Sequence, residues 1–540
     1  MPRFPTSRRH AALTKDRPNI VLIIADHVAF AGHYGSAQYN YRWPVLDSLA
    51  DQGAWFDNAY AITPVCTPSR ASMLTGKRPD KHGMRWNCEY PIPYNRKEFR
   101  DDEVLYCQSL AEAGYQNHYI GKWHCGTENG PEHYGLTGWS LPEYGNVYAS
   151  DTYKQYLERL GEPHPTCHIE HHLLNPSLSG TDVLMQPDEP WDFMDGAGVL
   201  SGSAEVHEQF FVANMARDKL TEIAANKTDD PFSMVISLWG PHHPYYPSRE
   251  FADLINPADI PKYPSFDETL EDKPLRYRIQ RDLRCQHRAG ERWADWEIWQ
   301  TVLARCYASG LQTDAAIGRV TNCLNELGLD DNTLLIVTAD HGDGIAAHGA
   351  GWDKYSSFTE EVGRIPLVMR WPENIQPSVS VTDPVNLLDV TATMLSAAGA
   401  ETDHPLSPDG EDLLPIINAE KHRESMICDH FGHSGDVCFQ KILYTDGWKY
   451  VSAYSAGDEL YDLENDPYEL NNLIDDQSTF ERQQQMRAAI IVHYKQRREE
   501  RENWHAQEFW EKGVVFSSPE WPRDETLHLY QLETQQLPKS

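Results

Sequence analysis

Four stretches of the chain share one hydrophobic pattern, a continuous apolar run that ends in charged or imidazole side chains. A run of this length is typical of a strand buried on both faces of a parallel sheet. Because ligands bind at the carboxyl ends of strands in open α/β sheets, we expect the terminal side chains to share one site. The runs are 19–27, ending in Asp26-His27, 115–124, ending in Lys122 and His124, 232–244, ending in His242-His243, and 334–343, ending in Asp340-His341.

Helix-like segments alternate with these runs, at 45–56, 104–114 and 299–328, and the last two stop at Gly114 and Gly328. This alternation predicts an α/β fold with a large, mostly parallel sheet flanked by helices. Residues 140–200 are rich in Gly, Pro, His and acidic residues with little periodicity, so we expect long loops there.

The pattern changes after about residue 425. Residues 438–473 predict short antiparallel strands, with a hairpin turn at Asp446-Gly447, and a polar helix is expected over about 476–510. We therefore expect two domains: a catalytic domain over 1–425, and a smaller α+β C-terminal subdomain with a helical tail over 426–540.

Composition narrows the partners. The 47 basic and 81 acidic residues give a net charge of −34, which argues against nucleic acid or an anionic membrane. An anionic substrate would then need positive charge supplied locally. The sequence carries no signal for an oligomeric state.

The cysteines and the N-terminus indicate the compartment. Ten cysteines include no Cys-x-x-Cys pair, which fits scattered reduced thiols. Arg8-Arg9 precede no apolar stretch until 19–25, which is short and ends in Asp26, so we expect no signal peptide or membrane span and a cytoplasmic protein.

The segment CTPSRASMLTG, residues 66–76, is the most specific motif. Pro68 and Ser69 can start a helix, which would set Arg70 and the first-turn amides beside Cys66 as an anion site. The run resembles the signature of type I sulfatases of the alkaline phosphatase-like superfamily. In that family a separate maturation enzyme oxidises the cysteine of Cys-x-Pro-x-Arg to formylglycine (3-oxoalanine).

Further motifs extend the resemblance to residues 17–475. The family's YIGKWH run matches Tyr119–His124, and its Pro-His-x-Pro run matches 241–244. Lys354 matches a family lysine that precedes Glu361–Leu367, and residues 459–473 match a run of the small C-terminal subdomain.

The resemblance implies a metal site. Asp26, His27, Asp340 and His341, together with Cys66, would bind one divalent metal, although either aspartate alone could instead cap a helix. Carboxylate oxygens favour Ca²⁺. His27 stands where the family commonly has Asp. Because histidine is a softer ligand, Mg²⁺ and Mn²⁺ are alternatives to Ca²⁺. His27 could also lie outside the metal's ligand shell.

The resemblance also implies catalytic roles. One hydroxyl of hydrated formylglycine would attack sulfur, Arg70, Lys122 and Lys354 would stabilise the sulfate oxygens, His242 would protonate the leaving alcohol, and His124 would take the proton of the remaining hydroxyl. The catalytic residues expected are Cys66, Arg70, Lys122, His124, His242 and Lys354. The substrate-binding residues expected from the resemblance are Lys122, His242 and Lys354. His433, in the run DHFGHSGD over 429–436, is expected to line the substrate pocket as well.

We expect a sulfuric ester hydrolase that acts on a sulfated mono- or oligosaccharide. The alternatives are a phosphonate monoester or phosphodiester hydrolase of the same superfamily, and an alkyl or choline sulfatase. A two-zinc metallophosphatase is a further alternative, but this chain has Cys and not the required Ser or Thr nucleophile at position 66. A non-enzymatic sulfoglycan-binding scaffold would be expected to have lost Cys66, Arg70 or Lys122, and all three are present.

Overall fold

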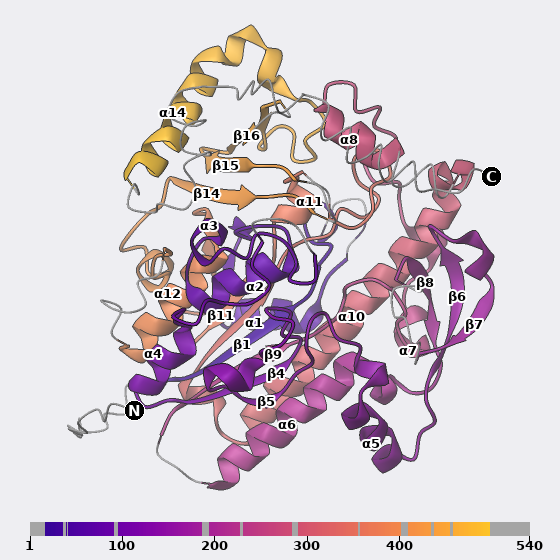
Figure 1. The fold of residues 1–540 in the computed structure, drawn as a ribbon, viewed down its shortest axis with the longest axis vertical. Helices are drawn as coiled ribbons and strands as arrows, with labels where there is room; N and C mark the ends of the chain where they lie inside the picture. The colour runs from indigo at the N-terminus through magenta and orange to yellow at the C-terminus, as the bar shows by residue number, and fades with distance from the viewer. Residues whose placement is uncertain are drawn as a thin grey trace.

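An eight-stranded sheet forms the centre of the protein in the computed structural model, which describes residues 17–35, 39, 41–90, 95–185, 194–226, 230–282, 290–354, 357–400, 409–433, 437–453 and 457–496. The strand order is β12-β2-β11-β10-β1-β9-β4-β5 (Figure 1). The four predicted runs form β1 (Asn19–Ala25), β4 (Gln116–Gly121), β9 (Phe232–Ser237) and β10 (Thr333–Ala339).

These four strands lie side by side and run parallel. β1 pairs with β10 and β9, and β9 pairs with β4. The sheet continues through β5 (Thr137–Trp139), β11 (Leu367–Arg370), β2 (Ala54–Phe56) and β12 (Val379–Val381), where β11 is antiparallel to both of its neighbours. Six of the seven residues of β1 are buried, as expected for a strand covered on both faces, and the predicted α/β class is confirmed.

Two groups of helices cover this sheet (Figure 1). One group contains α6 (Glu208–Asn226) and α10 (Trp296–Glu326), and the other contains α2 (Cys66–Thr75), α4 (Tyr106–Glu112) and α12 (Leu387–Ala398). α10 starts where the Asp295 carboxylate accepts the Glu297 N–H. The helix predicted over 45–56 is shorter, because α1 spans Pro44–Asp51 and residues 54–56 join the sheet as β2.

The expectation of loops over residues 140–200 was wrong. The segment contains α5 (Asp151–Leu160) and an antiparallel sheet of β6 (Thr166–His172), β7 (Thr181–Leu184) and β8 (Gly196–Leu200), which packs against α10. In β6, exposed and buried side chains alternate over only four residues: Thr166 and His168 are exposed, and Cys167 and Ile169 are buried. A register irregularity between Ile169 and His171 then interrupts it, which hid the strand in the sequence.

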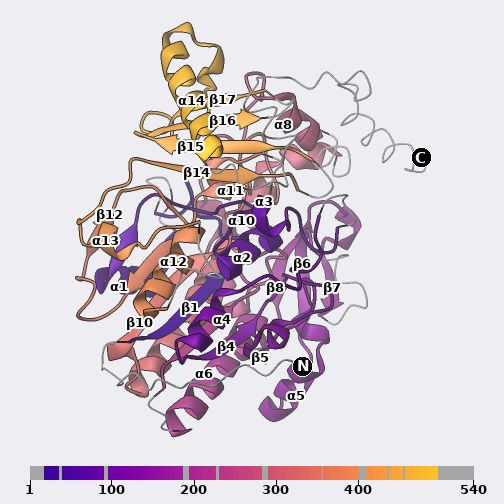
Figure 2. The same cartoon turned by 60° about the vertical axis from the view of Figure 1, so that its left-hand side comes forward.

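A four-stranded antiparallel sheet follows near the C-terminus (Figure 2). Its strands are β14 (Ser425–His430), β15 (Gln440–Thr445), β16 (Trp448–Ala453) and β17 (Glu459–Asp462), and α14 (Phe480–Gln496) packs on β15 and β16. The predicted hairpin is present, with Asp446 at φ 50° and Gly447 at φ 73°. The rest of the predicted 476–510 helix and of the tail lies outside the described residues.

Across the described residues we find no helix with the length and apolar character needed to cross a membrane. Eight buried cysteines of the described ranges are free: Cys66, Cys88, Cys107, Cys125, Cys167, Cys306, Cys323 and Cys428.

Candidate active site

The predicted strand ends converge at the carboxyl edge of the sheet. Asp26 follows β1, Asp340 and His341 follow the adjacent β10, and Cys66 opens α2 beside them. Ligand atoms of Asp26, Cys66, Asp340 and His341 lie within 4.8 Å of one another, and all four residues are buried. The Cys66 Sγ is 3.2 Å from His341 Nε2.

Two cations balance the two carboxylates. Arg70 donates from Nε to Asp340 Oδ2 at 2.8 Å, and its Nη2 is 3.5 Å from Asp26 Oδ1. Lys122 donates to the other oxygen of Asp26. Burial by itself would raise the pKa of Asp340, but Arg70 outweighs it and holds that pKa well below its usual range. The same carboxylates raise the pKa of Arg70 against the effect of burial.

These four residues fit a single divalent cation. His341 Nδ1 donates to the Gly342 carbonyl at 2.8 Å, which leaves Nε2 with its lone pair directed into the cluster. Asp26 Oδ1 and Arg70 Nη2 are buried and have no hydrogen-bond partner among the described residues. Two carboxylates and one imidazole around an unsatisfied oxygen are a donor set suited to a metal ion.

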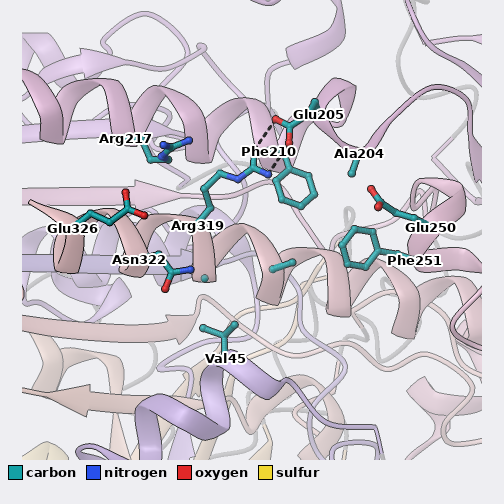
Figure 3. A pocket seen from close by; sticks show the side chains of 12 residues that line it. Val45, Ala204, Glu205, Phe210, Arg217, Glu250, Phe251, Arg319, Asn322 and Glu326 are labelled. Atoms are coloured by element: carbon teal, nitrogen blue, oxygen red, sulfur yellow. Dashed lines mark hydrogen bonds and ion pairs between the residues drawn. The ribbon is translucent and has the colours of Figure 1, made fainter. Parts of the chain in front are cut away.

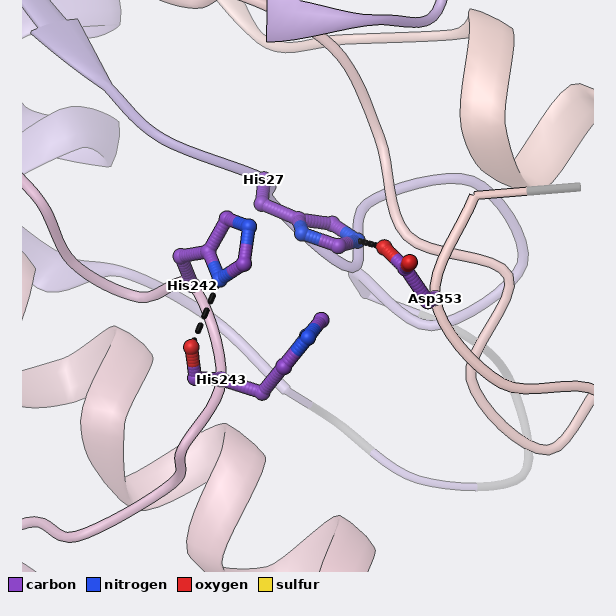
Figure 4. Close-up of side chains that lie close together, drawn as sticks. All are labelled: His27, His242, His243 and Asp353. Carbon is purple, nitrogen blue, oxygen red and sulfur yellow. Dashed lines mark hydrogen bonds and ion pairs between the residues drawn. The ribbon is translucent and has the colours of Figure 1, made fainter. Parts of the chain in front are cut away.

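His27 lies in a neighbouring cluster with His242, His243 and Asp353 (Figure 4). Its backbone is left-handed, with φ 62°, and its ring lies between His242 and Asp353. His27 Nδ1 is 3.3 Å from Lys354 Nζ, and Nε2 is 3.6 Å from Asp353 Oδ1. The structure therefore brings four of the five predicted metal ligands together and sets His27 beside them.

Lys354 is the centre of this second cluster. Its Nζ is 2.9 Å from Asp353 Oδ1 and 3.3 Å from His242 Nε2. Burial, and then the neighbouring His243 and Lys354, lower the pKa of His242 well below its ordinary value. A proton held at His242 Nε2 is therefore readily released.

His433 reaches this cluster from the loop after β14. Its Nε2 is 2.9 Å from Asp353 Oδ2, so His433 contacts the carboxylate that holds Lys354.

Lys122 and His124 complete the predicted set at the end of β4. Lys122 Nζ lies 4.0 Å from the centre of the Tyr144 ring. His124 Nε2 is 3.0 Å from both carboxylate oxygens of Glu89. Burial would lower the pKa of His124, but Glu89 outweighs it and the pKa is raised, while the pKa of Glu89 falls to about 2 against the effect of burial.

Sequence reasoning missed three residues of this site. Asp353 adjoins the predicted Lys354, so the adjacency could have indicated it. Glu89 and Tyr144 follow no strand end and belong to no motif that we used, and only the folded chain brings them to His124 and Lys122.

A profile of the family described as "Sulfatase" matches residues 18–400. The chain belongs to the sulfatase family. It is therefore a sulfuric ester hydrolase. A second profile, "N-sulphoglucosamine sulphohydrolase, C-terminal", matches residues 348–496. The uncharacterized sulfatase YidJ of Escherichia coli (strain K12) is 31% identical over 480 residues, covering 85% of this chain and 84% of the relative.

Solved structures share the sulfatase fold. The phosphonate monoester hydrolase of Silicibacter pomeroyi superposes with a TM-score of 0.70 at 20% identity, covering 89% of this chain and 96% of that one. A protein solved in complex with its substrate D-glucosamine-2-N,6-O-disulfate superposes with a TM-score of 0.66 at 21% identity, covering 89% of this chain and 98% of that one.

A hollow of about 510 Å³ lies away from this site, between α6 and α10 (Figure 3). Arg319 crosses it to Glu205, with nitrogen to oxygen distances of 2.6 Å, and stacks on Phe210. None of the predicted site residues lines this hollow.

Proposed function

We propose that this sulfatase removes sulfate from a sulfated mono- or oligosaccharide, with Cys66 converted to formylglycine and one divalent metal bound beside it. The single observation that carries the proposal is the position of Cys66. It opens α2 next to Asp26, Asp340, His341 and Arg70, where strand ends, helix N-terminus and buried cations meet.

Asp26, Asp340, His341 and residue 66 would hold the metal, and His27 would stand outside its ligand shell. When bound, the metal would neutralise charge on the sulfate oxygens and activate a hydroxyl of residue 66. The carboxylates favour Ca²⁺, and the imidazole of His341 keeps Mg²⁺ and Mn²⁺ as alternatives.

Three cations of the chain would bind the sulfate group. Arg70 and Lys122 contact Asp26, and Lys354 contacts Asp353 and His242. In a buried site these fixed charges would stabilise oxygens that gain charge in the transition state without reorganisation. They also supply the local positive charge that a chain of net charge −34 needs to bind an anion.

His242 and His124 would carry the protons. His242 Nδ1 donates to the His243 carbonyl at 2.6 Å, so a second proton would sit on Nε2, beside Lys354, and would pass to the leaving oxygen. His124 interacts with the Cys66 side chain and would accept a proton from residue 66. Lys122, His242 and Lys354 would contact the substrate directly.

The carbohydrate substrate is supported by the disulfated glucosamine bound to one structural neighbour. The free, buried cysteines support the cytoplasmic location expected from the sequence. In that compartment the substrate would be a small imported sugar sulfate. The maturation enzyme would be a transient partner.

A phosphonate monoester hydrolase is the second candidate, because the neighbour from Silicibacter pomeroyi has the higher TM-score. Paired assays with 4-nitrophenyl sulfate and an aryl phosphonate separate the two. A kcat/KM at least tenfold higher on the phosphonate would replace the sulfate assignment.

The test of the proposal combines mass spectrometry with one variant. In protein produced with a maturation enzyme, the peptide containing residue 66 should carry the mass of formylglycine. The Cys66→Ala variant should lose activity by about 10⁴-fold or more, because the nucleophile is gone. Full activity in protein whose Cys66 is unmodified, or in Cys66→Ala, would refute it. A panel of defined sugar sulfates, with choline sulfate and alkyl sulfates as comparisons, then tests the substrate class.

A further inference from the structure

Glu89 binds one edge of the His124 ring. Both carboxylate oxygens lie 3.0 Å from His124 Nε2, and the His124 side chain is 1% exposed. His124 Nδ1 is buried and has no hydrogen-bond partner among the described residues, while the ring interacts with the Cys66 side chain. Because Glu89 occupies Nε2, the nitrogen that serves residue 66 is Nδ1.

Thr67 fixes the backbone on both sides of this pair. Its hydroxyl donates to the His124 carbonyl at 2.7 Å and accepts the Cys88 N–H at 3.2 Å. Its own N–H donates to the Asn87 side chain at 3.1 Å. The residue after Cys66 therefore ties together the two segments that deliver Glu89 and His124.

The backbone of His124 is strained. Its φ of 51° is in the left-handed region, which is unfavourable for a residue other than glycine. The contacts around a residue in such a conformation determine the direction of its ring. For the His124 ring, the contact at Nε2 is with Glu89.

We propose that Glu89 is a positioning residue that orients His124 for proton transfer from residue 66. Glu89 accepts the proton on Nε2, so the tautomer with a free lone pair on Nδ1 is selected. One proton then moves from the O–H or S–H of residue 66 to His124 Nδ1, and the oxygen or sulfur keeps its electron pair. The role of Glu89 in turnover rests on the proposed function, but the hydrogen bond between Glu89 and His124 does not depend on it.

The cluster of Cys88, Glu89 and His124 could instead hold a metal ion. Both Glu89 oxygens, however, are directed to the same ring nitrogen, and the Cys88 thiol donates to Oε2 at 3.4 Å, so hydrogen bonds within the chain already join the three side chains. Metal analysis of the Glu89→Gln variant separates the two: a loss of one equivalent of metal relative to wild type would overturn the positioning role.

The first measurement uses unconverted protein, in which residue 66 is still a thiol. The thiolate is the form that reacts with iodoacetamide, and a histidine that takes the thiol proton increases it. We expect Glu89→Gln to slow alkylation of Cys66, followed in its peptide by mass spectrometry, by about tenfold. Glu89→Asp keeps the carboxylate and should restore part of the rate. Equal rates in wild type and Glu89→Gln, zero included, would overturn the proposal.

The second measurement uses converted enzyme and 4-nitrophenyl sulfate. We expect Glu89→Gln to lower kcat by about 10²-fold or more with KM changed less than threefold, in the range that general base catalysis contributes. Glu98→Gln is the matched control, because the Glu98 carboxylate accepts backbone N–H groups of Thr127 and Glu128 rather than contacting His124. An effect of the same size in Glu98→Gln, or none in Glu89→Gln, would contradict the assignment.

The two measurements separate this proposal from the proposed function. If the converted wild-type enzyme hydrolyses no sulfate ester, the proposed function fails, but the alkylation experiment still tests the Glu89–His124 pair. If Glu89→Gln does not fold, Glu89→Asp carries both tests. Its carboxylate is one methylene shorter, so an alkylation rate and kcat equal to wild type would then overturn the positioning role.

Discussion

Two of the buried charge clusters among the described residues differ in how their polar atoms are hydrogen-bonded. One is the candidate active site. The other, here called the clamp, consists of His348, Glu360, Glu361, Lys449 and Glu469, and joins the segment around α11 (Glu360–Gly363) to the C-terminal sheet. Both clusters bury several ionised groups, but they differ in how many of their buried polar atoms form hydrogen bonds.

The clamp pairs its carboxylates within the chain. Glu360 accepts hydrogen bonds from the hydroxyls of Tyr60 and Tyr444, both at 3.0 Å, and lies 3.4 Å from Lys449. Glu469 lies 2.7 Å from the same lysine. A buried charge with such partners stabilises only while every partner remains.

The candidate active site contains more buried polar atoms without a hydrogen bond than the clamp does. Asp26 Oδ1, His27 Nε2, Arg70 Nη2 and His124 Nδ1 are buried with no hydrogen-bond partner among the described residues. A buried polar atom without a hydrogen bond costs about 1–3 kcal/mol, so a cluster that contains four of them is suited to a ligand that would bond to them. In the clamp, Glu469 Oε1 is the one such atom among the described residues, so the number of these atoms, and not buried charge as such, separates the two clusters.

The largest effect on stability should come from the clamp. In Lys449→Met, Glu360 and Glu469 lose their common cation, and the free energy of unfolding should fall by about 3–5 kcal/mol. The kcat of the folded enzyme should stay within twofold of wild type. Urea unfolding and steady-state assays measure the two quantities.

The control is Lys421→Met, which removes an exposed ion pair with Glu411 and should change stability by less than about 1 kcal/mol. If Lys449→Met were no more destabilised than this control, the clamp would contribute little to the fold. If it lost activity while remaining folded, the two clusters would be coupled.

The pH dependence of stability should come next. His348 lies 2.8 Å from Glu268 and 3.2 Å from Glu361, and these carboxylates outweigh burial and raise its pKa to about 10. The folded protein therefore holds a proton that the unfolded chain loses near pH 6.5. The stabilisation is complete below about pH 6.5 and is lost as the pH rises to 10, at up to about 1.4 kcal/mol per pH unit.

Urea unfolding at pH 7, 8 and 9 measures this slope. His348→Gln cannot titrate, so its stability should vary less steeply with pH than that of wild type. Identical slopes in the two proteins would show that the clamp histidine is not protonated between its carboxylates.

The sequence predicted most of the residues that lie together at the candidate active site, because these residues follow buried strands. The apolar runs predicted β1, β4, β9 and β10, and parallel pairing then brought Asp26, Lys122 and Asp340 to one edge. The pattern of apolar residues does not, however, predict the backbone torsion angles of the residues that follow a strand. The left-handed φ of His27 turns its ring toward Lys354, which the adjacency to Asp26 could not reveal.

The clamp was not predicted at all. Its carboxylates and lysine lie on segments far apart in the chain. Glu361 and Glu469 belong to runs that resemble the family, but the resemblance did not indicate that they meet. Their burial follows from docking of the C-terminal sheet, a tertiary event without a local sequence signature. The strand β6 was missed for a related reason, since its alternation is short and interrupted by an irregularity.

The smallest effect should come from His433, which belongs to the C-terminal part yet contacts the active site. In His433→Gln, Asp353 loses its imidazole partner and holds Lys354 less firmly. We expect kcat on 4-nitrophenyl sulfate to fall about tenfold, which is about 1.4 kcal/mol, with KM little changed. His422→Gln is the control, because that histidine is exposed and pairs only loosely with Asp383, at 3.6 Å.

The KM of His433→Gln decides between two roles. The sequence predicted a substrate-binding residue, whose loss would raise KM and leave kcat nearly unchanged. A residue that acts through Asp353 on Lys354 and His242 would change kcat instead, because those groups act on the transferring sulfate and the leaving oxygen. A fall in kcat would mean that the C-terminal part contributes to the chemistry through an ion pair, as it contributes to the fold through the clamp.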